Sequence, residues 1–222
     1  MTSPDLEIEF SDAAPVRDSS PVAFVSRSAL LHNARDARAR GARTFSQRVL
    51  AGDAWGHGID LVRSTLESVG IVTGTDDLDP EHLFGVSGSG GVPAMALVGT
   101  VLSVKRLRAG EGVSYGYLHR APTDTRIALV TGGYAQGVVR SLGGKISVAH
   151  AEGQLPVIGR VAMDVCVVDV GDSGVMRGDN VLFFGRSEQG APPVREWARE
   201  SGLSIAEITT MVGLRAVRRV AE

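Results

Sequence analysis

The stretch VLAGDAWGHG, residues 49–58, has the form of a turn at which a catalytic side chain could stand. Two apolar residues end a strand-like run, small residues follow, and Gly56-His57-Gly58 opens an expected helix. Enzymes built from alternating strands and helices place their reactive groups at such turns. Ala51 stands where the strand should meet the turn, and its methyl group can neither attack a substrate nor carry a proton. These residues alone leave open whether the stretch is an active site or a place where one used to be.

A second stretch, AGEGVSYGYLHR at residues 109–120, contains a tyrosine beside a tight turn. Tyr115 lies between a strand-like Val113-Ser114 pair and Gly116. A phenol has a pKa of about 10 and works as a general base only where positive charge lowers that pKa. Tyr115 is therefore either a packing residue or a base, and its sequence neighbours leave both interpretations open.

A third stretch, GRVAMDVCVVDV at residues 159–170, interrupts a run of valines with Met163 and Asp164. A carboxylate within such a strand requires a polar partner. We expect Asp164 to cap a bulge or to pair with Arg160, with a catalytic role as the alternative. The spacing of the 5 histidines and the single cysteine, Cys166, does not match a metal site.

The composition is that of an ordinary soluble protein. Of 222 residues, 43% are hydrophobic and 22% charged, with 23 basic against 25 acidic side chains. This balance, together with 5% aromatic residues, argues against a nucleic-acid partner. A single cysteine excludes an internal disulfide framework and fits a reducing compartment. No apolar run has the length of a membrane span, so we expect a cytoplasmic protein without a membrane partner.

The elements that must position these residues fall into three parts. Residues 1–21, with five acids and one arginine, are predicted to form a flexible acidic leader. Residues 22–91 are predicted to hold a short βα pattern and a Gly-rich linker over 72–91. Within this part, strands are expected at 22–27 and 46–52, and helices at 28–41 and 59–70.

Strands dominate the third part, residues 92–222. Runs rich in β-branched residues are separated by Gly, Asp and Pro turns, which is typical of a compact barrel or sandwich. The fold class predicted from these patterns is α+β with a β-rich C-terminal domain. Strands are expected within 96–107, 126–133, 145–149, 156–170, 179–186 and 214–220, and a helix at 193–202.

Together these stretches resemble alanine racemase, the pyridoxal-phosphate enzyme that interconverts L- and D-alanine. The resemblance runs from about Val92 to Arg219 and implies the barrel-like C-terminal domain of that family. Several motifs carry it in the expected order: VPAMAL, VKRLRAGEGVSYG, GGYAQGVVR, VIGRVAMDV, GDNVLFFG and RAVRRV.

The N-terminal part resembles the same family over a shorter length. AFVSRSALLHNARDAR is similar to the opening strand and helix of the family's (β/α)8 barrel, and VLAGDAWGHG to its cofactor-lysine motif, V-V-K-A-D-A-Y-G-H-G. The resemblance places Ala51 at the cofactor lysine and Trp55 at the motif tyrosine. It therefore implies a cofactor site without the lysine that forms the Schiff base.

Two further departures accompany the missing lysine, and the second of them spoils part of the surface that the chain would lend to a partner. A (β/α)8 barrel takes about 250 residues, whereas roughly 70 separate Pro21 from Val92, so the N-terminal part is interpreted as a truncated barrel remnant. The family's tyrosine in a Tyr-Glu pair near the C-terminus falls on Ala206, before Glu207. We therefore expect no bound pyridoxal phosphate.

The other half of the site matches the family. The resemblance implies that Tyr115 corresponds to the second catalytic base, Met163 to a substrate-carboxylate contact with Asp164 beside it, and Tyr134 to an entryway tyrosine. In the family these residues face the partner subunit's barrel in a head-to-tail dimer. Their retention has either a functional reason or a structural one, because the SYG turn and the MD bulge can be required by the β domain itself.

The preferred hypothesis is a degenerate racemase homologue that acts as a binding, regulatory or structural module. The alternative is racemase-type activity in association with a complete racemase, to which the chain would lend Tyr115 and Met163. A third reading is an unrelated small-molecule binder. We expect a homodimer, because a truncated barrel exposes surface and strand edges that attract another chain. A complete racemase or another protein is the alternative partner.

Overall fold

Six strands form a closed barrel in the computed structural model, which describes residues 20–222 apart from 76, 87 and 187–189. The ring closes because the first half of the long strand β4 pairs with β11 while its second half pairs with β7. All neighbouring pairs in the ring are antiparallel. In ring order the strands are β4 (Met95–Leu107), β7 (Thr125–Thr131), β10 (Val165–Asp169), β9 (Gly153–Ile158), β8 (Ser147–His150) and β11 (Asn180–Phe184).

Two more strands extend this sheet from β4. Strand β1 (Val22–Ser26) runs antiparallel to β4 and parallel to β12 (Val217–Ala221). The strand expected over 22–27 is thus present, but it belongs to the large sheet rather than to the βα elements that follow it. Of the predicted leader, residues 1–19 lie outside the described residues.

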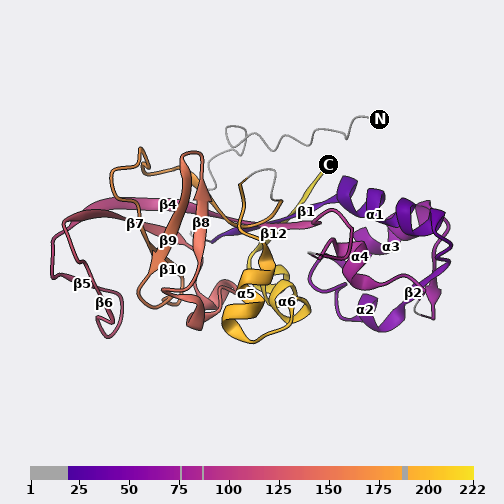
Figure 1. Cartoon of the computed structure of the whole chain (residues 1–222). Coiled ribbons are helices and arrows are strands. Elements are labelled where there is room, and N and C mark those ends of the chain that lie inside the picture. Colours follow the sequence, from indigo (N-terminus) through magenta and orange to yellow (C-terminus); the bar gives the residue numbers. More distant parts are fainter. Residues whose placement is uncertain (1–19, 76, 87, 187–189) are drawn as a thin grey trace.

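A small βα lobe follows β1, and it lies at one end of the molecule in Figure 1. Its two short strands form a parallel pair of three residues each, and its helices pack around them. The buried rings of Phe45 and Phe84 meet edge to face at 6.2 Å in its centre. The lobe comprises α1 (Arg27–Ala39), β2 (Thr44–Ser46), α2 (Gln47–Ala51), α3 (Ile59–Ser68), β3 (Val72–Gly74) and α4 (Pro80–Phe84).

The prediction of a strand over residues 46–52 is wrong for all but its first residue. Only Thr44–Ser46 is a strand, and Gln47–Ala51 forms the single-turn helix α2. The reason is the shortness of the partner, since β3 ends at Gly74 opposite Ser46. Beyond that point no strand is available to accept the backbone hydrogen bonds, and the chain satisfies them within a helical turn.

The linker predicted over residues 72–91 also contains regular structure. It includes β3 and α4, and the helix begins where the Asp79 side chain accepts a hydrogen bond from the Glu81 amide at 2.9 Å. Asn33 of α1 is fully buried, and its side-chain amide donates to the carbonyls of Leu83 and Val92 at 2.9 and 2.8 Å. One buried side-chain amide thus fixes Leu83 and Val92, which lie on either side of the glycines of this segment, to α1.

Two C-terminal helices lie between the barrel and the βα lobe (Figure 1). The expected helix is α5 (Val194–Ser201), whereas α6 (Ile205–Arg215) was not predicted. Helix α6 begins with a capping box in which Ser204 and Glu207 bond each other's backbone amides. Within the described residues, none of the helices combines the length and apolar character needed to cross a membrane.

The βα lobe docks onto α6 through two glycines. A Cβ built on Gly213 of α6 would overlap the carbonyl of Gly56, and one built on Gly56 would overlap the carbonyl of Thr209. The two backbones therefore approach closely only because both positions are glycine.

Replacing Gly213 with Ala should destabilise the fold by about 1–3 kcal/mol through this overlap. A loss of stability would be informative, because Ala inside a helix is otherwise more stable than Gly by about 1 kcal/mol. Urea unfolding at fixed protein concentration measures the effect. Gly52→Ala is the control, since its nearest atoms would lie at 3.6 Å, and equal stabilities of the two variants would contradict the docking.

Candidate functional site

The turn formed by residues 53–58, here called the motif turn, has a left-handed backbone. The φ angles of Asp53, Ala54 and Trp55 are 55°, 52° and 53°, and that of Gly56 is 79°. A left-handed conformation costs a residue with a side chain roughly 1–2 kcal/mol, so the surrounding contacts must hold this turn in place. Such strain at a ligand-binding or catalytic motif is a reason to examine what the turn presents.

An aspartate and an arginine hold the motif turn. One carboxylate oxygen of Asp53 accepts the amide of Ile59 at 3.1 Å, which caps α3, and the other forms an ion pair with Arg218 of β12. Arg218 also donates to the Gly56 carbonyl at 3.1 Å. No local sequence pattern predicts this pair, because 165 positions separate its members.

His57 is buried beneath the motif turn and is 2% exposed. Its Nδ1 donates to the Ala54 carbonyl at 2.9 Å, and its ring stacks on Phe84 with centroids 4.2 Å apart. Burial lowers the pKa of His57 to about 4, because an apolar setting disfavours the charged ring. The imidazole is therefore neutral at pH 7.

Ala51 lies at the C-terminal end of α2 with an exposed side chain, rather than at the end of a strand. Trp55 is half-buried, with its ring 5.3 Å from that of Phe84. A groove of about 640 Å³ between α2 and α6 is lined by Gly52 and Trp55 on one side and by Ala206 on the other. Positions that differ from the family motifs, 55 and 206, are thus brought together.

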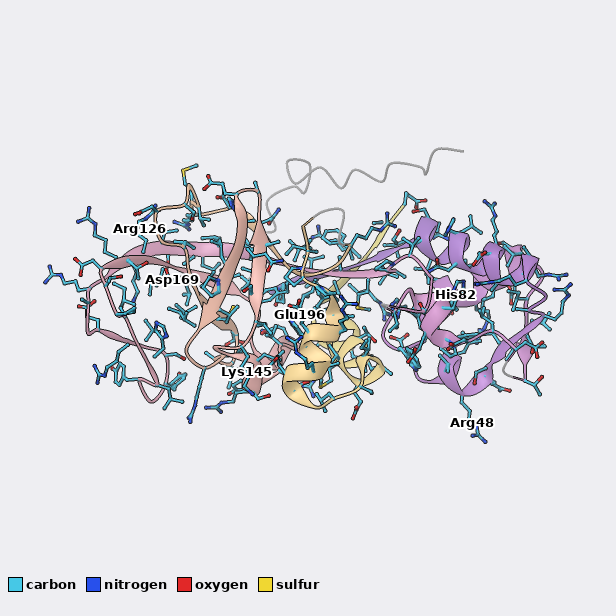
Figure 2. The ribbon with its side chains drawn as sticks, in the orientation of Figure 1. Arg48, His82, Arg126, Lys145, Asp169 and Glu196 are labelled. Carbon is cyan, nitrogen blue, oxygen red and sulfur yellow. The ribbon has the colours of Figure 1, made fainter. Side chains whose placement is uncertain are left out.

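The residues near Ala51 do not fit a covalently held pyridoxal phosphate, because neither α2 nor the motif turn contains a lysine. The sequence contains Lys105, in β4, and Lys145, whose ammonium donates to the Glu200 carbonyl at 3.3 Å beside α5. Figure 2 shows Lys145 well away from Arg48, which marks α2. Neither of these two lysines belongs to α2 or the motif turn.

Tyr134, Met163 and Asp164 come together at the barrel. The amide of Tyr134, in the short helix η1 (Tyr134–Gln136), donates to the Ala162 carbonyl at 2.9 Å. The Asp164 carbonyl accepts from Gly132 at 3.0 Å. These backbone bonds fix the GGYAQG and VAMD segments against each other, so the two motifs form one surface.

The sequence suggested an Asp164–Arg160 pair as one possibility, but in the structure Asp164 has a different partner. Its Oδ1 accepts a hydrogen bond from the Gln136 side-chain amide at 3.0 Å, and Gln136 in turn accepts from the Gly133 amide. Gln136 follows Tyr134 in the GYAQG segment, so its carboxamide reaches the carboxylate directly. Asp164 therefore has the structural role of linking the two motifs, and the expected partner was wrong.

Tyr115 lies in the turn between β5 (Gly112–Val113) and β6 (His119–Arg120). Ser114, with a φ of 63°, anchors the turn because its hydroxyl donates to the Arg160 carbonyl at 2.5 Å. Tyr115 is 69% exposed, and Met163 is 53% exposed. The segment 159–163 holds both the hairpin, through Ser114 and Arg160, and η1, through Tyr134 and Ala162. We call the exposed apolar side chains of these three segments the open face: Tyr115, Tyr117, Leu118, Tyr134 and Met163.

Tyr115 and Ala51 lie far apart within one chain, whereas the segment with Tyr134 lies between them, since Gly137 after η1 closely approaches Met211 and Val212 of α6. The β5–β6 hairpin that carries Tyr115 lies at one end of the molecule and the helix α2 that ends at Ala51 at the other, as Figure 1 shows. The sequence identified residues of both halves but could not reveal this separation.

The profile of the alanine racemase C-terminal domain matches residues 94–220. The chain belongs to this family. Alanine racemases align with it over parts of their length: the one from Mycobacterium tuberculosis (strain ATCC 25618 / H37Rv) is 44% identical over 54% of this chain and 32% of the relative. The one from Frankia casuarinae is 37% identical over 72% of this chain and 40% of the relative. The chain thus matches between about a third and two fifths of the length of these curated relatives.

Solved structures of racemases share the fold of this family member. Alanine racemase from Streptomyces coelicolor A3(2) aligns with a TM-score of 0.79 at 18% identity, over 91% of this chain and 98% of that one. A histidine racemase from Leuconostoc mesenteroides aligns with a TM-score of 0.70 at 13% identity, over 94% and 99%. Racemases named for different amino acids share this fold, so the fold alone does not identify a substrate.

Stability should fall between pH 6.5 and pH 4 because of His57. Its folded pKa of about 4 lies below the unfolded value of 6.5, so the unfolded chain binds more protons in this range and acid favours unfolding. The loss amounts to up to about 3 kcal/mol. Urea unfolding across this range measures it in the wild type and in His57→Gln, which should show a shallower slope. Parallel profiles would contradict the buried, neutral histidine.

Proposed function

We propose that this family member does not racemise amino acids on its own and acts as a binding module through its open face. The observation that carries the proposal is the division of the site between two parts of the chain. The α2–α6 groove with Ala51, Trp55 and Ala206 near it departs from the family motifs, whereas the barrel segments with Tyr115, Tyr134 and Met163 retain them. In this proposal the open face still binds a partner, although the chain no longer catalyses racemisation.

The loss of activity follows from Ala51. A Schiff base requires an amine, and the resemblance supplies one only through the lysine at this position. In the family, the remaining barrel positions the cofactor, and the two-stranded lobe of this chain has few elements with which to do so. Positioning alone accounts for several kcal/mol of a catalysed barrier. We therefore propose that no pyridoxal phosphate is held covalently.

The occupant of the open face is, in this proposal, a second copy of the chain. The face is not covered by the chain's own βα lobe, which lies at the far end of the molecule. In a two-fold dimer, the open face of each chain would lie against the α2–α6 groove of the other chain. The same contact would then form twice, because two-fold symmetry repeats every contact. The groove presents Val49, Trp55 and Met211 to apolar side chains such as Met163.

A complete alanine racemase is the second candidate partner. The observation that favours it is that Tyr115, Tyr134 and Met163 remain exposed, as residues contributed to another chain would have to be. Such a partner would supply the lysine and the barrel, and this chain would supply its half of the site. The position of Ala206 lies on the other half and does not obstruct this arrangement.

Neither the wild type nor Ala51→Lys should racemise alanine. The substitution restores an amine on α2 but leaves the truncated barrel unchanged. Turnover is measured with L-alanine and added pyridoxal phosphate, and borohydride reduction followed by mass spectrometry of the wild type should show no phosphopyridoxyl-lysine. Turnover by the wild type, or a stoichiometric adduct on Lys105 or Lys145, would refute the proposed loss of activity.

Sedimentation at micromolar concentration should give a homodimer. Met163→Glu should shift it toward the monomer by at least tenfold in dissociation constant, because a carboxylate would be buried in an apolar contact. Met176→Glu is the matched control, since Met176 is 66% exposed outside the open face.

A monomeric wild type would refute self-association through the open face. Mixing that monomer with a complete alanine racemase then tests the second candidate. Co-sedimentation that Met163→Glu abolishes and Met176→Glu leaves intact would support the racemase as partner, and separate sedimentation would refute it.

A further inference from the structure

A cavity of about 700 Å³ lies between the βα lobe, the start of β4 and helices α5 and α6. This volume is within the range of sites that hold a small organic ligand. The motif turn contributes Trp55 and His57, α4 ends at Phe84 on its wall, and α5 contributes Arg195 and Glu196. It is distinct from the α2–α6 groove, although Trp55 lines both.

The cavity lies at the junction of the two family-like parts of the chain. Described residues between Phe84 and Met95 line it, and this is where the resemblance passes from the barrel motifs to the C-terminal domain. Asn33 holds this segment against α1 through its bonds to Leu83 and Val92, so the segment does not collapse into the space.

Aromatic rings form one wall of the cavity. The ring of Phe84 is 5.3 Å from that of Trp55 and 4.2 Å from that of His57. His57 is neutral at pH 7 because its burial lowers its pKa to about 4. Phe84 and His57 are only 4% and 2% exposed, so the half-buried Trp55 is the ring of this group that a ligand in the cavity can contact, and His57 adds no positive charge. Tryptophan has the ring face that attracts cations most strongly.

Glu196 of α5 lines the same cavity as these rings. It is half-buried, and among the described residues its side chain has neither an ion pair nor a hydrogen bond. Figure 2 shows Glu196 between α5 and the strands above it. Its place in the first turn of α5 suits an acid, but that effect leaves its oxygens available. Arg195, the other charged residue of the lining, is exposed and already has a partner.

We propose that this cavity binds a small organic cation, an amine with an apolar ring, whose ammonium group pairs with Glu196 and whose ring packs against Trp55. A tryptophan ring and a carboxylate that line the same cavity are the groups that recognise such ligands. The site is independent of the open face and of racemase activity, so it stands or falls separately from the proposed function.

Benzylamine and benzyl alcohol are the matched probes, because they share a ring and differ in charge at pH 7. Calorimetric titration of the full chain should show benzylamine binding at least about fivefold more tightly. Glu196→Gln should abolish that preference, while Glu200→Gln, which removes a half-buried carboxylate of the same helix outside the cavity lining, should retain it. Melting curves establish that both variants are folded.

The indole N–H resonance of Trp55, assigned with Trp55→Phe, provides a measurement on the wild type alone. Benzylamine should shift this resonance with the same dissociation constant as calorimetry gives. Equal affinity for the two probes, an unchanged preference in Glu196→Gln, or binding that leaves the Trp55 resonance in place would each overturn the proposal. Absence of benzylamine binding at millimolar concentration would overturn it as well.

Discussion

The close approach of the motif turn to α6 is the contact on which the arrangement of the molecule depends. Gly56 and Gly213 bring the backbones together, and Arg218 of β12 fixes the same turn through Asp53. Through β12 this contact is continuous with β1 and the large sheet. One hydrophobic cluster accordingly extends from Phe45 in the βα lobe to core strands of the barrel. A lobe with two three-residue strands is stable here because it shares that core.

The sequence predicted the β domain well because its determinants are local. β-branched runs between Gly and Asp turns specify strands wherever neighbours exist on both sides, as they do in a closed barrel. The strand expected at 46–52 failed for the opposite reason, since its apolar run has a partner only up to Ser46. Helix α6 was missed although SIAE is a capping-box sequence, which was the available signal.

The candidate site was predictable as residues but not as geometry. Motif matching located Ala51, Trp55, Tyr115, Tyr134 and Met163, because each lies in a short stretch with a recognisable pattern. The Asp164–Gln136 bond, the burial of His57 and the distance between the two halves depend on long-range packing. Such features follow from which elements remain in the chain, and no local pattern encodes that.

The distribution of the departures has a physical meaning of its own. Trp55 and Ala206 line one groove, so the larger ring at 55 and the missing ring at 206 are changes to a single surface. That surface has no lysine at position 51 and has an apolar wall. The open face, by contrast, has exposed aromatic side chains whose hydration costs free energy in an isolated chain. An apolar groove beside α6 and exposed apolar side chains on the barrel are complementary, and this complementarity is the physical basis on which we propose that a second molecule covers both.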